Sequence, residues 1–361
     1  MSWPTWLPLR QILRPMSPYG APQVPARASL NTNENPYPPS LVLQQAITDA
    51  IAKVAGDLNR YPDRDATALR ASLANYINEQ SGAKFSEENV WAANGSNEII
   101  QSIFLAFAAG PVLGFTPSYS MHPLIAKVTG STWIDGKRNA DFSLNTSDAV
   151  AQILENKPSL TFIATPNNPT GGAVTIEAIQ ALSDACKSVG GLLVVDEAYA
   201  EFSQEKSAVT LIANNPHVVV IRTMSKAFAF AGARVGYLVS DEAVKDAMMI
   251  VRLPYHLSAL TQAAAQVAIN HRAELLSGVS TLITSRGAVV QAIHNMGLAT
   301  IPSSANFVLF TGFEQESAQL WAALLEKGVL IRDVGLSGYL RVTIGNEAEN
   351  ELFISSLKEL V

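Results

Sequence analysis

The chain has very few residues of the kinds that build disulfides or metal clusters. It contains one cysteine, Cys186, and five histidines among its 361 residues. A single cysteine excludes an internal disulfide and is typical of a reducing compartment. The histidines are scattered, and neither His-x-x-x-His nor Cys-x-x-Cys spacing occurs, so the sequence does not support a protein-bound metal.

Long apolar runs and dense charge are also missing. No run of about 18 apolar residues is uninterrupted, so we expect no membrane anchor. Residues 1–30 carry prolines and arginines where a secretory signal needs a continuous apolar stretch, and we therefore expect a cytoplasmic protein. Charged residues make up 16% of the chain, the net charge is −6 and no basic run occurs, which argues against nucleic acid as a partner.

Apolar residues are abundant and amount to 48% of the chain. This content allows a large buried interior, and single cores usually stop growing at roughly 250–300 residues, so we expect two domains. Residues 1–39 hold nine of the 19 prolines. Because proline interrupts helices, this segment is predicted to be an extended arm that lies on another surface.

Helix and strand periodicities alternate between residues 40 and 250. Amphipathic helices are predicted over residues 40–57 and 65–82, ending at Gly56 and Gly82, and over residues 175–191. Short apolar runs bounded by turn-forming residues predict strands at 90–94, 111–115, 159–166, 191–199, 217–223 and 235–240. Continuously apolar strands joined by helices indicate an α/β fold with a mostly parallel central sheet covered on both faces.

The pattern changes after about residue 250. A long helical stretch at 261–297 is followed by strands at 305–310 and 339–345 with a helix between them, and by a final helix at 346–361. We therefore expect three units: the arm at 1–39, a large domain at 40–250 and a smaller α+β domain at 251–361. The arm is expected to contact the small domain.

Two segments, VVDEAY and RTMSKAF followed by AGAR, carry the strongest chemical signal. Asp196 ends an apolar strand, Tyr199 follows three residues later, and Lys226 comes after the next strand. The carboxyl ends of parallel strands meet at one edge of a sheet, where ligands bind. Pyridoxal phosphate needs an amine for its aldehyde, an anion for its ring nitrogen and a donor for O3′. These three residues could supply all of them.

Ordinary roles remain open for these residues when each is taken alone. Asp196 could cap the next helix, and Lys226 could be a surface lysine whose stem covers apolar atoms. A carboxylate at the end of a buried strand is unfavourable unless a cation pairs with it, and a pyridinium is such a cation. The combined spacing favours the cofactor. Lys226 could then also act as the base that moves a proton at the substrate.

Two further segments could hold the cofactor phosphate. Ser225 and Arg234 accompany Lys226 and offer a hydroxyl and a guanidinium suited to an anion. In NGSNE, residues 94–98, a glycine turn opens a helix, so the N–H groups of Ser96 and Asn97 could face an anion at the positive end of the helix dipole. An ordinary serine cap explains the second segment equally well.

Four more residues are candidates for ring or substrate contacts. Tyr119 in TPSYSMH could stack on the pyridine ring, or it could be a plain core or surface tyrosine. Asn168 in TPNNPTGG could donate to O3′ or could serve only its turn. Arg341 interrupts an apolar strand and Arg332 precedes it, so each needs an anion partner, either a substrate group or an internal carboxylate.

Taken together, these segments resemble the fold-type I pyridoxal phosphate aminotransferases, and among them the histidinol-phosphate aminotransferase family. The most specific stretches are residues 194–202 and 222–237. The other matching segments are SPYG, LNTNENPYPPS, RYPD, NGSNE, TPSYSMH, TPNNPTG, PYHLS, ANFVLF and LIRDVGLSGYLRVTIG. The resemblance therefore covers nearly the whole chain.

The resemblance implies a homodimer with active sites at the subunit boundary and a role for each candidate. Lys226 would be bonded to the cofactor and Asp196 would face its ring nitrogen. The remaining cofactor contacts would be Asn168 and Tyr199 at O3′, Tyr119 on the ring, and Ser96, Asn97, Ser225, Arg234 and Tyr61 of the partner subunit at the phosphate. Tyr19, Arg332 and Arg341 would contact the substrate. Asn97 departs from the pattern, because some relatives carry aspartate at this position. The difference changes what the side chain of residue 97 can do, whereas its backbone contact with the phosphate would be the same.

The implied reaction converts L-histidinol phosphate and 2-oxoglutarate into imidazole acetol phosphate and L-glutamate, a step of histidine biosynthesis. An aromatic amino acid aminotransferase is an alternative, and a phosphothreonine decarboxylase is a more distant one. A non-enzymatic effector-binding domain of a transcription regulator is a third. That alternative needs a DNA-binding module, which the proline-rich residues 1–39 cannot supply as a helix-turn-helix.

Overall fold

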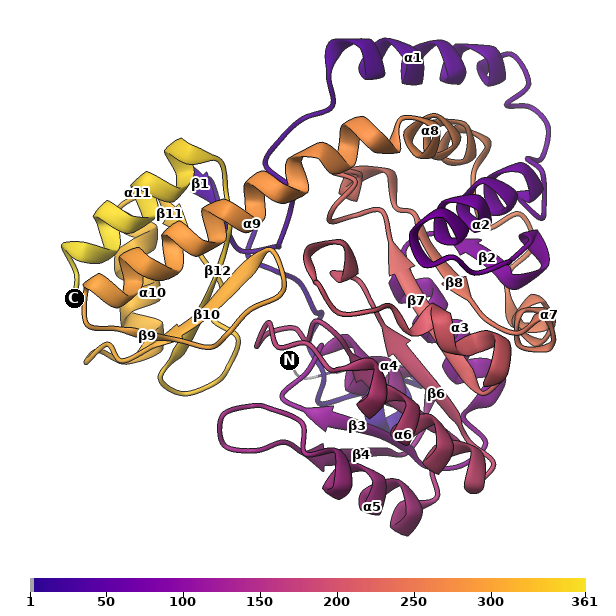
Figure 1. Cartoon of the computed structure of the whole chain (residues 1–361), viewed down its shortest axis with the longest axis horizontal. Coiled ribbons are helices and arrows are strands. Elements are labelled where there is room, and N and C mark those ends of the chain that lie inside the picture. The colour runs from indigo at the N-terminus through magenta and orange to yellow at the C-terminus, as the bar shows by residue number, and fades with distance from the viewer. Residues whose placement is uncertain (1–2) are drawn as a thin grey trace.

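The computed structural model describes residues 3–361, so the first two residues of the predicted arm lie outside it. Its centre is a seven-stranded sheet with the order β2-β8-β7-β6-β5-β3-β4 (Figure 1). The strands are β2 (Val90–Ala93), β3 (Val112–Thr116), β4 (Trp133–Lys137), β5 (Leu160–Ala164), β6 (Leu192–Asp196), β7 (Val218–Thr223) and β8 (Gly236–Val239). Strand β8 is antiparallel to both of its neighbours, β2 and β7, and the other pairs of this sheet are parallel, which confirms the mostly parallel α/β prediction.

Helices cover both faces of this sheet. They are α1 (Leu41–Ala55), α2 (Thr67–Ser81), α3 (Ser96–Phe107), α4 (Met121–Thr129), α5 (Thr146–Asn156), α6 (Ile176–Ser188), α7 (Glu242–Val251) and α8 (Ala259–Asn270). Because side chains alternate along a strand, Val218 and Val220 of β7 join one buried cluster, and Val219 and Ile221 join the other. Burial on both faces explains why the strands are apolar throughout. We call this sheet with α1–α8 the large part.

Most predicted element ends are confirmed. The Ser40 side chain caps α1 by accepting the Leu43 N–H at 3.2 Å, and α2 ends at Gly82 with a φ of 71°. Strand β4 was not predicted, because WIDGK is a half-exposed edge strand without a continuous apolar run. The long helical stretch expected at 261–297 is divided at His271 into two helices, α8 and α9 (Arg272–Asn295). No glycine or proline stands at this position to indicate the break in the sequence.

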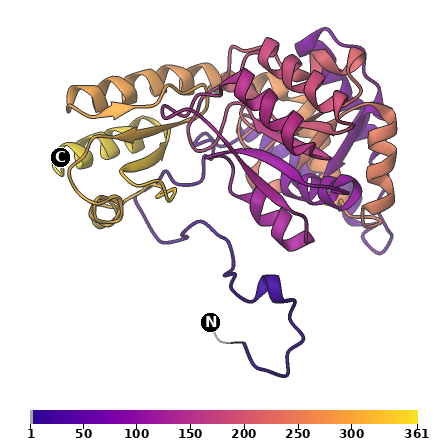
Figure 2. The same cartoon turned by 90° about the horizontal axis from the view of Figure 1, so that it is seen from below.

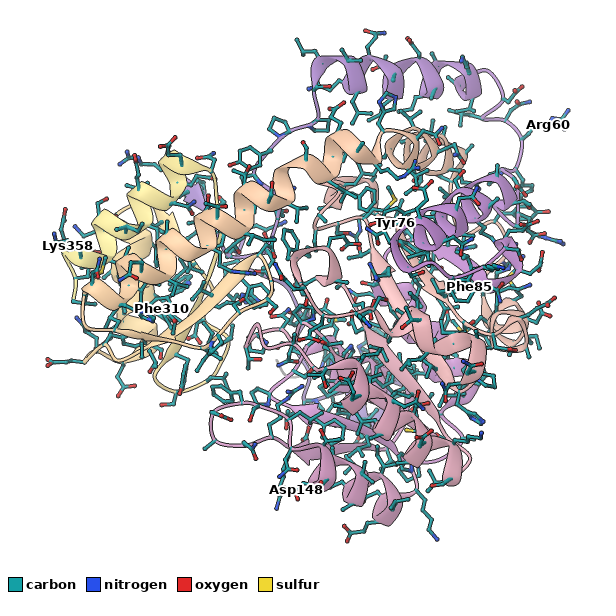
Figure 3. The ribbon with its side chains drawn as sticks, viewed as in Figure 1. Arg60, Tyr76, Phe85, Asp148, Phe310 and Lys358 are labelled. Carbon is teal, nitrogen blue, oxygen red and sulfur yellow. The ribbon has the colours of Figure 1, made fainter. Side chains whose placement is uncertain are left out.

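The small part contains α9 and a three-stranded antiparallel sheet of order β12-β10-β9. Its elements after α9 are β9 (Ala299–Thr300), β10 (Phe307–Thr311), α10 (Ser317–Glu326), β11 (Val329–Leu330), β12 (Tyr339–Thr343) and α11 (Glu347–Lys358). In the arm, β1 (Ala28–Ser29) pairs in parallel with β11, so the arm contacts the small part as expected. Figure 3 places Phe310 of β10 within the small part and Tyr76 of α2 within the large part.

The arm before β1 is extended, as its prolines predict, and Figure 2 shows it running outside the rest of the molecule. Arg10 ties it to α4 by donating to the Val128 carbonyl at 2.8 Å. Short 3-10 helices are η1 (Gln11–Leu13), η2 (Glu87–Asn89), η3 (Ala200–Phe202), η4 (Ala208–Asn214) and η5 (Ala231–Ala233). Across residues 3–361, none of the helices combines the length and apolar character needed to cross a membrane.

Candidate active site

A cavity of about 590 Å³ lies where the large part, the arm and the small part meet. Ala164, Asp196 and Thr223, the last residues of β5, β6 and β7, form part of its wall. It therefore lies at the carboxyl ends of parallel strands, and its volume suits a cofactor with a small substrate. All the predicted site residues except Tyr61 line this cavity; they are Tyr19, Ser96, Asn97, Tyr119, Asn168, Asp196, Tyr199, Ser225, Lys226, Arg234, Arg332 and Arg341.

Asp196 is a buried carboxylate that is only 4% exposed. Its Oδ1 accepts the Ala198 N–H at 3.2 Å, and its Oδ2 lies 3.1 Å from Nε2 of His122. Among the described residues, His122 is the only basic side chain within 4.0 Å of this carboxylate. Asp196 therefore has its charge available for a cationic group of a ligand in the cavity.

No pattern in the sequence indicated a role for His122, although it lies in the TPSYSMH segment. It is 1% exposed on α4, and its ring packs edge-on against Tyr119 with centroids 5.4 Å apart. A lone histidine has no spacing signal, and folding brings it to Asp196 from 74 residues away. Its contact with Asp196 orients the carboxylate toward the cavity.

Lys226 has surroundings that favour its neutral amine. Burial, together with the charge of Arg341, lowers the pKa of Lys226 to about 8. Its Nζ donates to the Thr32 carbonyl at 2.8 Å, so the arm holds the amine in place. A neutral amine is the form that attacks an aldehyde, and a pKa near neutrality makes that form accessible.

Tyr199 is part of the cavity wall, and its hydroxyl takes part in hydrogen bonds there. The hydroxyl accepts from Nδ2 of Asn33 at 2.8 Å, and Nδ2 of Asn168 lies 3.5 Å away. Burial raises the pKa of Tyr199, so the phenol keeps its proton and can donate it in a hydrogen bond. Asn33 was also missed by the sequence analysis, although the LNTNENPYPPS segment contains it, because its partners Tyr199 and Thr343 are distant in the chain.

The beginning of α3 and Arg234 form a cradle for an anion. Gly95 precedes α3 with a φ of 92°, and a Cβ added there would lie 2.6 Å from the Arg234 guanidinium. A Cβ on Gly236 of β8 would lie 2.4 Å from the Ser96 nitrogen. The two glycines therefore let the guanidinium and β8 approach the helix N-terminus, where N–H groups and the helix dipole attract negative charge.

Side chains beside this cradle are held by hydrogen bonds. The Tyr119 hydroxyl donates to Oδ1 of Asn97 at 3.2 Å, which gives the Asn97 side chain a role in fixing that ring. Burial raises the pKa of Tyr119. Ser225 accepts from the Thr223 hydroxyl at 3.0 Å and remains a wall residue of the cavity.

Arg341 enters the cavity from β12 and is 6% exposed. It donates to Oδ1 of Asn168 and, at 2.8 Å, to the Asn31 carbonyl, and its guanidinium carbon lies 5.1 Å from the Phe307 ring centre. Its Nε has no partner, and no carboxylate of residues 3–361 lies within 4.0 Å of it. The alternative of an internal salt bridge is therefore wrong. Burial lowers the pKa of Arg341 to about 10, which leaves it charged at neutral pH.

Arg332 and Tyr19 line the cavity beside Arg341. The backbone N–H groups of Arg332 and Arg341 each donate to the other's carbonyl at 2.9 Å, so the two arginines are fixed side by side. The guanidinium carbon of Arg332 lies 6.0 Å from the ring centre of Tyr19. The Tyr19 hydroxyl accepts from Ser120 at 3.2 Å, which places this arm residue at the rim.

Tyr61 does not reach the cavity of its own chain. It is 79% exposed and stacks on Tyr255 with centroids 4.3 Å apart. Its neighbour Arg60, between α1 and α2, points away from the molecule in Figure 3. Tyr61 could contribute only to the cavity of another subunit, and its role remains a prediction.

A buried ionic cluster fixes the ends of the strands that carry Asp196 and Lys226. The guanidinium of Arg222 donates to Glu197 at 2.8 Å, to Glu201 at 2.9 Å and to Ser207 at 3.0 Å. Both carboxylates follow β6, whereas Arg222 belongs to β7, so the cluster binds these strands together below the cavity. None of its members is among the described residues that have a buried side-chain polar atom without a hydrogen-bond partner, which makes their burial tolerable.

The residues present fit pyridoxal phosphate. A buried carboxylate faces the cavity, a lysine with a lowered pKa enters it, and an anion cradle lies at the N-terminus of α3. A protonated phenol and an arginine without a carboxylate partner complete the wall. These are the groups that the cofactor and an anionic substrate need.

Known proteins share this architecture. The family model of class I and II aminotransferases matches residues 28–357. The histidinol-phosphate aminotransferase of Mycolicibacterium vanbaalenii is 52% identical over 97% of this chain and 95% of its own length. That of Mycobacterium sp. strain JLS is 50% identical over 98% of this chain and 94% of its own length.

Solved structures agree with this match. The histidinol-phosphate aminotransferase from Sinorhizobium meliloti in complex with pyridoxal-5'-phosphate has a TM-score of 0.81 at 25% identity, covering 93% of this chain and 91% of that one. An aspartate aminotransferase double mutant from Thermus thermophilus has a TM-score of 0.85 at 19% identity, covering 98% of this chain and 99% of that one, and shows the fold alone. The family match begins at β1 of the arm and ends in α11. It includes all the residues that line the cavity except those of the arm before residue 28. This chain therefore belongs to the class I and II aminotransferase family.

Proposed function

We propose that this enzyme transfers the amino group of L-histidinol phosphate to 2-oxoglutarate, with pyridoxal phosphate as cofactor. The observation that carries the choice of substrate is the 50–52% identity, over nearly the whole chain, to relatives named histidinol-phosphate aminotransferase. The site agrees with anionic substrates. Arg332 and Arg341 are fixed as neighbours in the cavity wall, and no carboxylate of residues 3–361 pairs with the guanidinium of Arg341.

The two arginines explain how one cavity accepts two amino donors. Histidinol phosphate carries a phosphate, and glutamate carries two carboxylates. A guanidinium offers paired N–H groups that match the oxygens of either anion. Arg341 and Arg332 thus bind the charge that both donors share, while the rest of the cavity accommodates an imidazole or a short acidic chain.

Different residues of the cavity wall would hold different groups of the cofactor. The N-terminus of α3, Arg234 and Ser225 would hold its phosphate, Tyr119 would contact its ring and Asp196 would pair with its ring nitrogen. Tyr199 and Asn168 would be the donors to O3′. Bound pyridoxal phosphate supplies an aldehyde that takes up the amino group and a ring that delocalises the electron pair left at the substrate Cα.

Proton transfer at the substrate falls to Lys226. Its pKa of about 8 lets the amine exist in both forms near neutral pH, which a general base and acid needs. The Asp196 carboxylate, oriented by His122, stabilises positive charge at the ring nitrogen. The buried cluster around Arg222 keeps the strand ends of Asp196 and Lys226 at a fixed separation.

A panel of amino donors assayed with 2-oxoglutarate tests this function. We expect kcat/KM for histidinol phosphate to exceed that for phenylalanine by at least about tenfold, because its phosphate can accept hydrogen bonds from both guanidinium groups, whereas phenylalanine offers them one carboxylate. Equal or better activity with phenylalanine would identify an aromatic amino acid aminotransferase. Release of carbon dioxide from phosphothreonine would instead indicate a decarboxylase.

We also propose a homodimer in which Tyr61 of the partner subunit completes the phosphate site. Its 79% exposure and its position outside the cavity of its own chain support this arrangement. A cytoplasmic location and the division into residues 1–39, 40–250 and 251–361 remain proposals as well. Helix α8 lies beyond residue 250 yet packs on α1 and α2 of the large part, so limited proteolysis should locate the true boundary.

A further inference from the structure

The connection between β4 and α5 reaches across from the large part to the small part (Figure 1). At its tip, the ring of Phe142 packs edge-on against the ring of Tyr339, the first residue of β12. Their centroids are 5.2 Å apart and their planes meet at 72°. Edge-to-face pairs of this kind are favourable and directional, so the contact fixes an angle as well as a distance.

The backbone of this connection is built to present Phe142. The residue adopts a φ of 67°, a left-handed conformation that is uncommon for a bulky side chain. The turn is closed by hydrogen bonds from the Phe142 N–H to the Asn139 carbonyl at 2.9 Å and from the Asn139 N–H to the Ser143 carbonyl at 3.0 Å. Such a conformation persists only where the surroundings hold it in place.

Arg138 braces the same turn. Its guanidinium donates to the Phe142 carbonyl at 3.3 Å and to the Phe115 carbonyl of β3 at 3.1 Å. Its third guanidinium nitrogen, Nη2, has no partner, and no carboxylate of the described residues pairs with it. This partly buried cation therefore anchors the turn to the strand that leads into Tyr119 of the cavity wall.

Strand β12 connects the turn to the substrate arginines. Tyr339 and Arg341 are two positions apart, so their side chains leave the same face of the strand. On that face Thr343 bonds to Asn33 and Phe307 packs on Tyr199, so this face lies against the arm and the large part. Because the backbone of Arg332 pairs with that of Arg341, the position of Arg332 depends on the position of β12.

Neither Phe142 nor Tyr339 lines the cavity, so their contact joins the two parts without belonging to the site itself. We propose that Phe142 is a positioning residue, which holds β12 against the large part so that Arg341 and Arg332 meet the anionic groups of both amino donors. This role rests on the proposed function, and it gives the residues of the turn no part in the chemical reaction.

Replacement of Phe142 by alanine tests the proposal. We expect KM for histidinol phosphate and KM for glutamate to rise together by roughly threefold to tenfold, as the loss of one edge-to-face pair predicts. The dissociation constant of 2-oxoglutarate, measured by calorimetry on the cofactor-loaded enzyme, should rise by the same factor. The affinity for pyridoxal phosphate and the visible spectrum should stay unchanged, because the cofactor contacts lie on other elements.

Two variants separate positioning from a general loss of packing. Phe142→Tyr keeps the ring edge and should restore native KM values. Phe313→Ala is the matched control: Phe313 makes a similar edge contact, with centroids 5.9 Å apart, to Phe310 inside the small part. Its loss should lower the thermal midpoint while leaving both KM values and the 2-oxoglutarate affinity unchanged. If Phe142→Ala does not fold, Phe142→Leu and Tyr339→Leu provide the same comparison.

The results distinguish failure of this proposal from failure of the function itself. An active wild-type enzyme whose Phe142→Ala variant keeps native KM and native 2-oxoglutarate affinity would overturn the positioning role. Equal KM increases in Phe142→Ala and Phe313→Ala would overturn it as well. A wild-type enzyme that is inactive with histidinol phosphate would instead refute the substrate, and 2-oxoglutarate binding would still report on Phe142.

Discussion

At the residue scale, the site depends on charged groups that burial has changed. Lys226 has its pKa lowered to about 8, and Arg341 has its pKa lowered to about 10. The two cations share one cavity, and the charge of Arg341 disfavours the protonated form of Lys226. Lysine can therefore lose its proton near neutral pH, whereas arginine keeps its charge, so Lys226 suits the proposed nucleophile and base and Arg341 suits the proposed anion site.

This difference predicts how attachment of the cofactor depends on pH. The folded pKa of Lys226 lies below the ordinary value of 10.5, so the neutral amine appears as pH rises through about 8. The rate at which the apoenzyme captures pyridoxal phosphate should increase about tenfold between pH 7 and pH 9. Stopped-flow absorbance measures it. In Arg341→Met the midpoint should move upward, and an unshifted midpoint would show that Arg341 does not act on the amine.

Replacement of Arg341 by alanine should weaken both amino donors. A hydrogen-bonded guanidinium contributes about 1.5–3 kcal/mol to binding an anion, which predicts a KM increase of roughly tenfold to a hundredfold. Steady-state kinetics with histidinol phosphate and with glutamate measure the effect. Unchanged KM values for both would remove Arg341 from the substrate site.

The sequence alone was sufficient to predict those site residues that lie in a contiguous motif with recognisable chemistry. Asp196, Tyr199 and Lys226 were recognised by spacing alone, and the structure brings them to one cavity. His122 and Thr32 were not recognised. Their contributions are a ring nitrogen beside a carboxylate and a carbonyl that accepts from an amine, and both arise only when distant segments meet.

At the element scale, the N-terminus of α3 and strand β8 form a tight junction. The predicted turn at residues 94–98 is confirmed as the start of α3, but the closeness of β8 was not visible in the sequence, because Gly236 reads as an ordinary strand residue. Likewise, the left-handed Phe142 and the division between α8 and α9 have no local signature. Contacts between elements decide these features.

Gly236→Ala should disturb the phosphate cradle. The added Cβ would lie 2.4 Å from the Ser96 nitrogen and 2.6 Å from the Gly95 carbonyl carbon, so the start of α3 must shift. We expect the dissociation constant of pyridoxal phosphate to rise by at least about tenfold, because displaced N–H groups no longer face the phosphate together. Equilibrium dialysis measures it. Gly287→Ala, which meets nothing within 4 Å, is the control and should bind normally.

At the scale of the whole molecule, the cavity needs the large part, the arm and the small part together. Sequence periodicity predicted the existence of these units but not the boundary along which they meet. That boundary consists of pairs such as Phe307 with Tyr199 and Thr343 with Asn33, whose members lie more than a hundred positions apart. No local pattern encodes such pairs.

The proposed homodimer predicts complementation between two defective chains, assayed at a cofactor concentration that loads the wild type but not the Tyr61→Ala homodimer. Lys226→Ala loses the amine, and Tyr61→Ala loses the phosphate contact supplied to the partner. Mixed after dissociation and reassociation, they should form dimers that contain one complete site and regain about a quarter of the wild-type activity, as random pairing into twofold assemblies predicts. An absence of recovery, with mixed dimers shown by mass spectrometry, would place Tyr61 outside the site.

Three consecutive arm residues each hold a different part of the cavity. The Asn31 carbonyl accepts from Arg341, the Thr32 carbonyl accepts from Lys226, and Asn33 donates to Tyr199. A version of this chain trimmed to begin just after residue 35 would keep its entire central sheet. It would nevertheless release the amine, the phenol and the guanidinium at once, so residues 31–33, which belong to no helix or strand, are as necessary to the cavity as the strands around it.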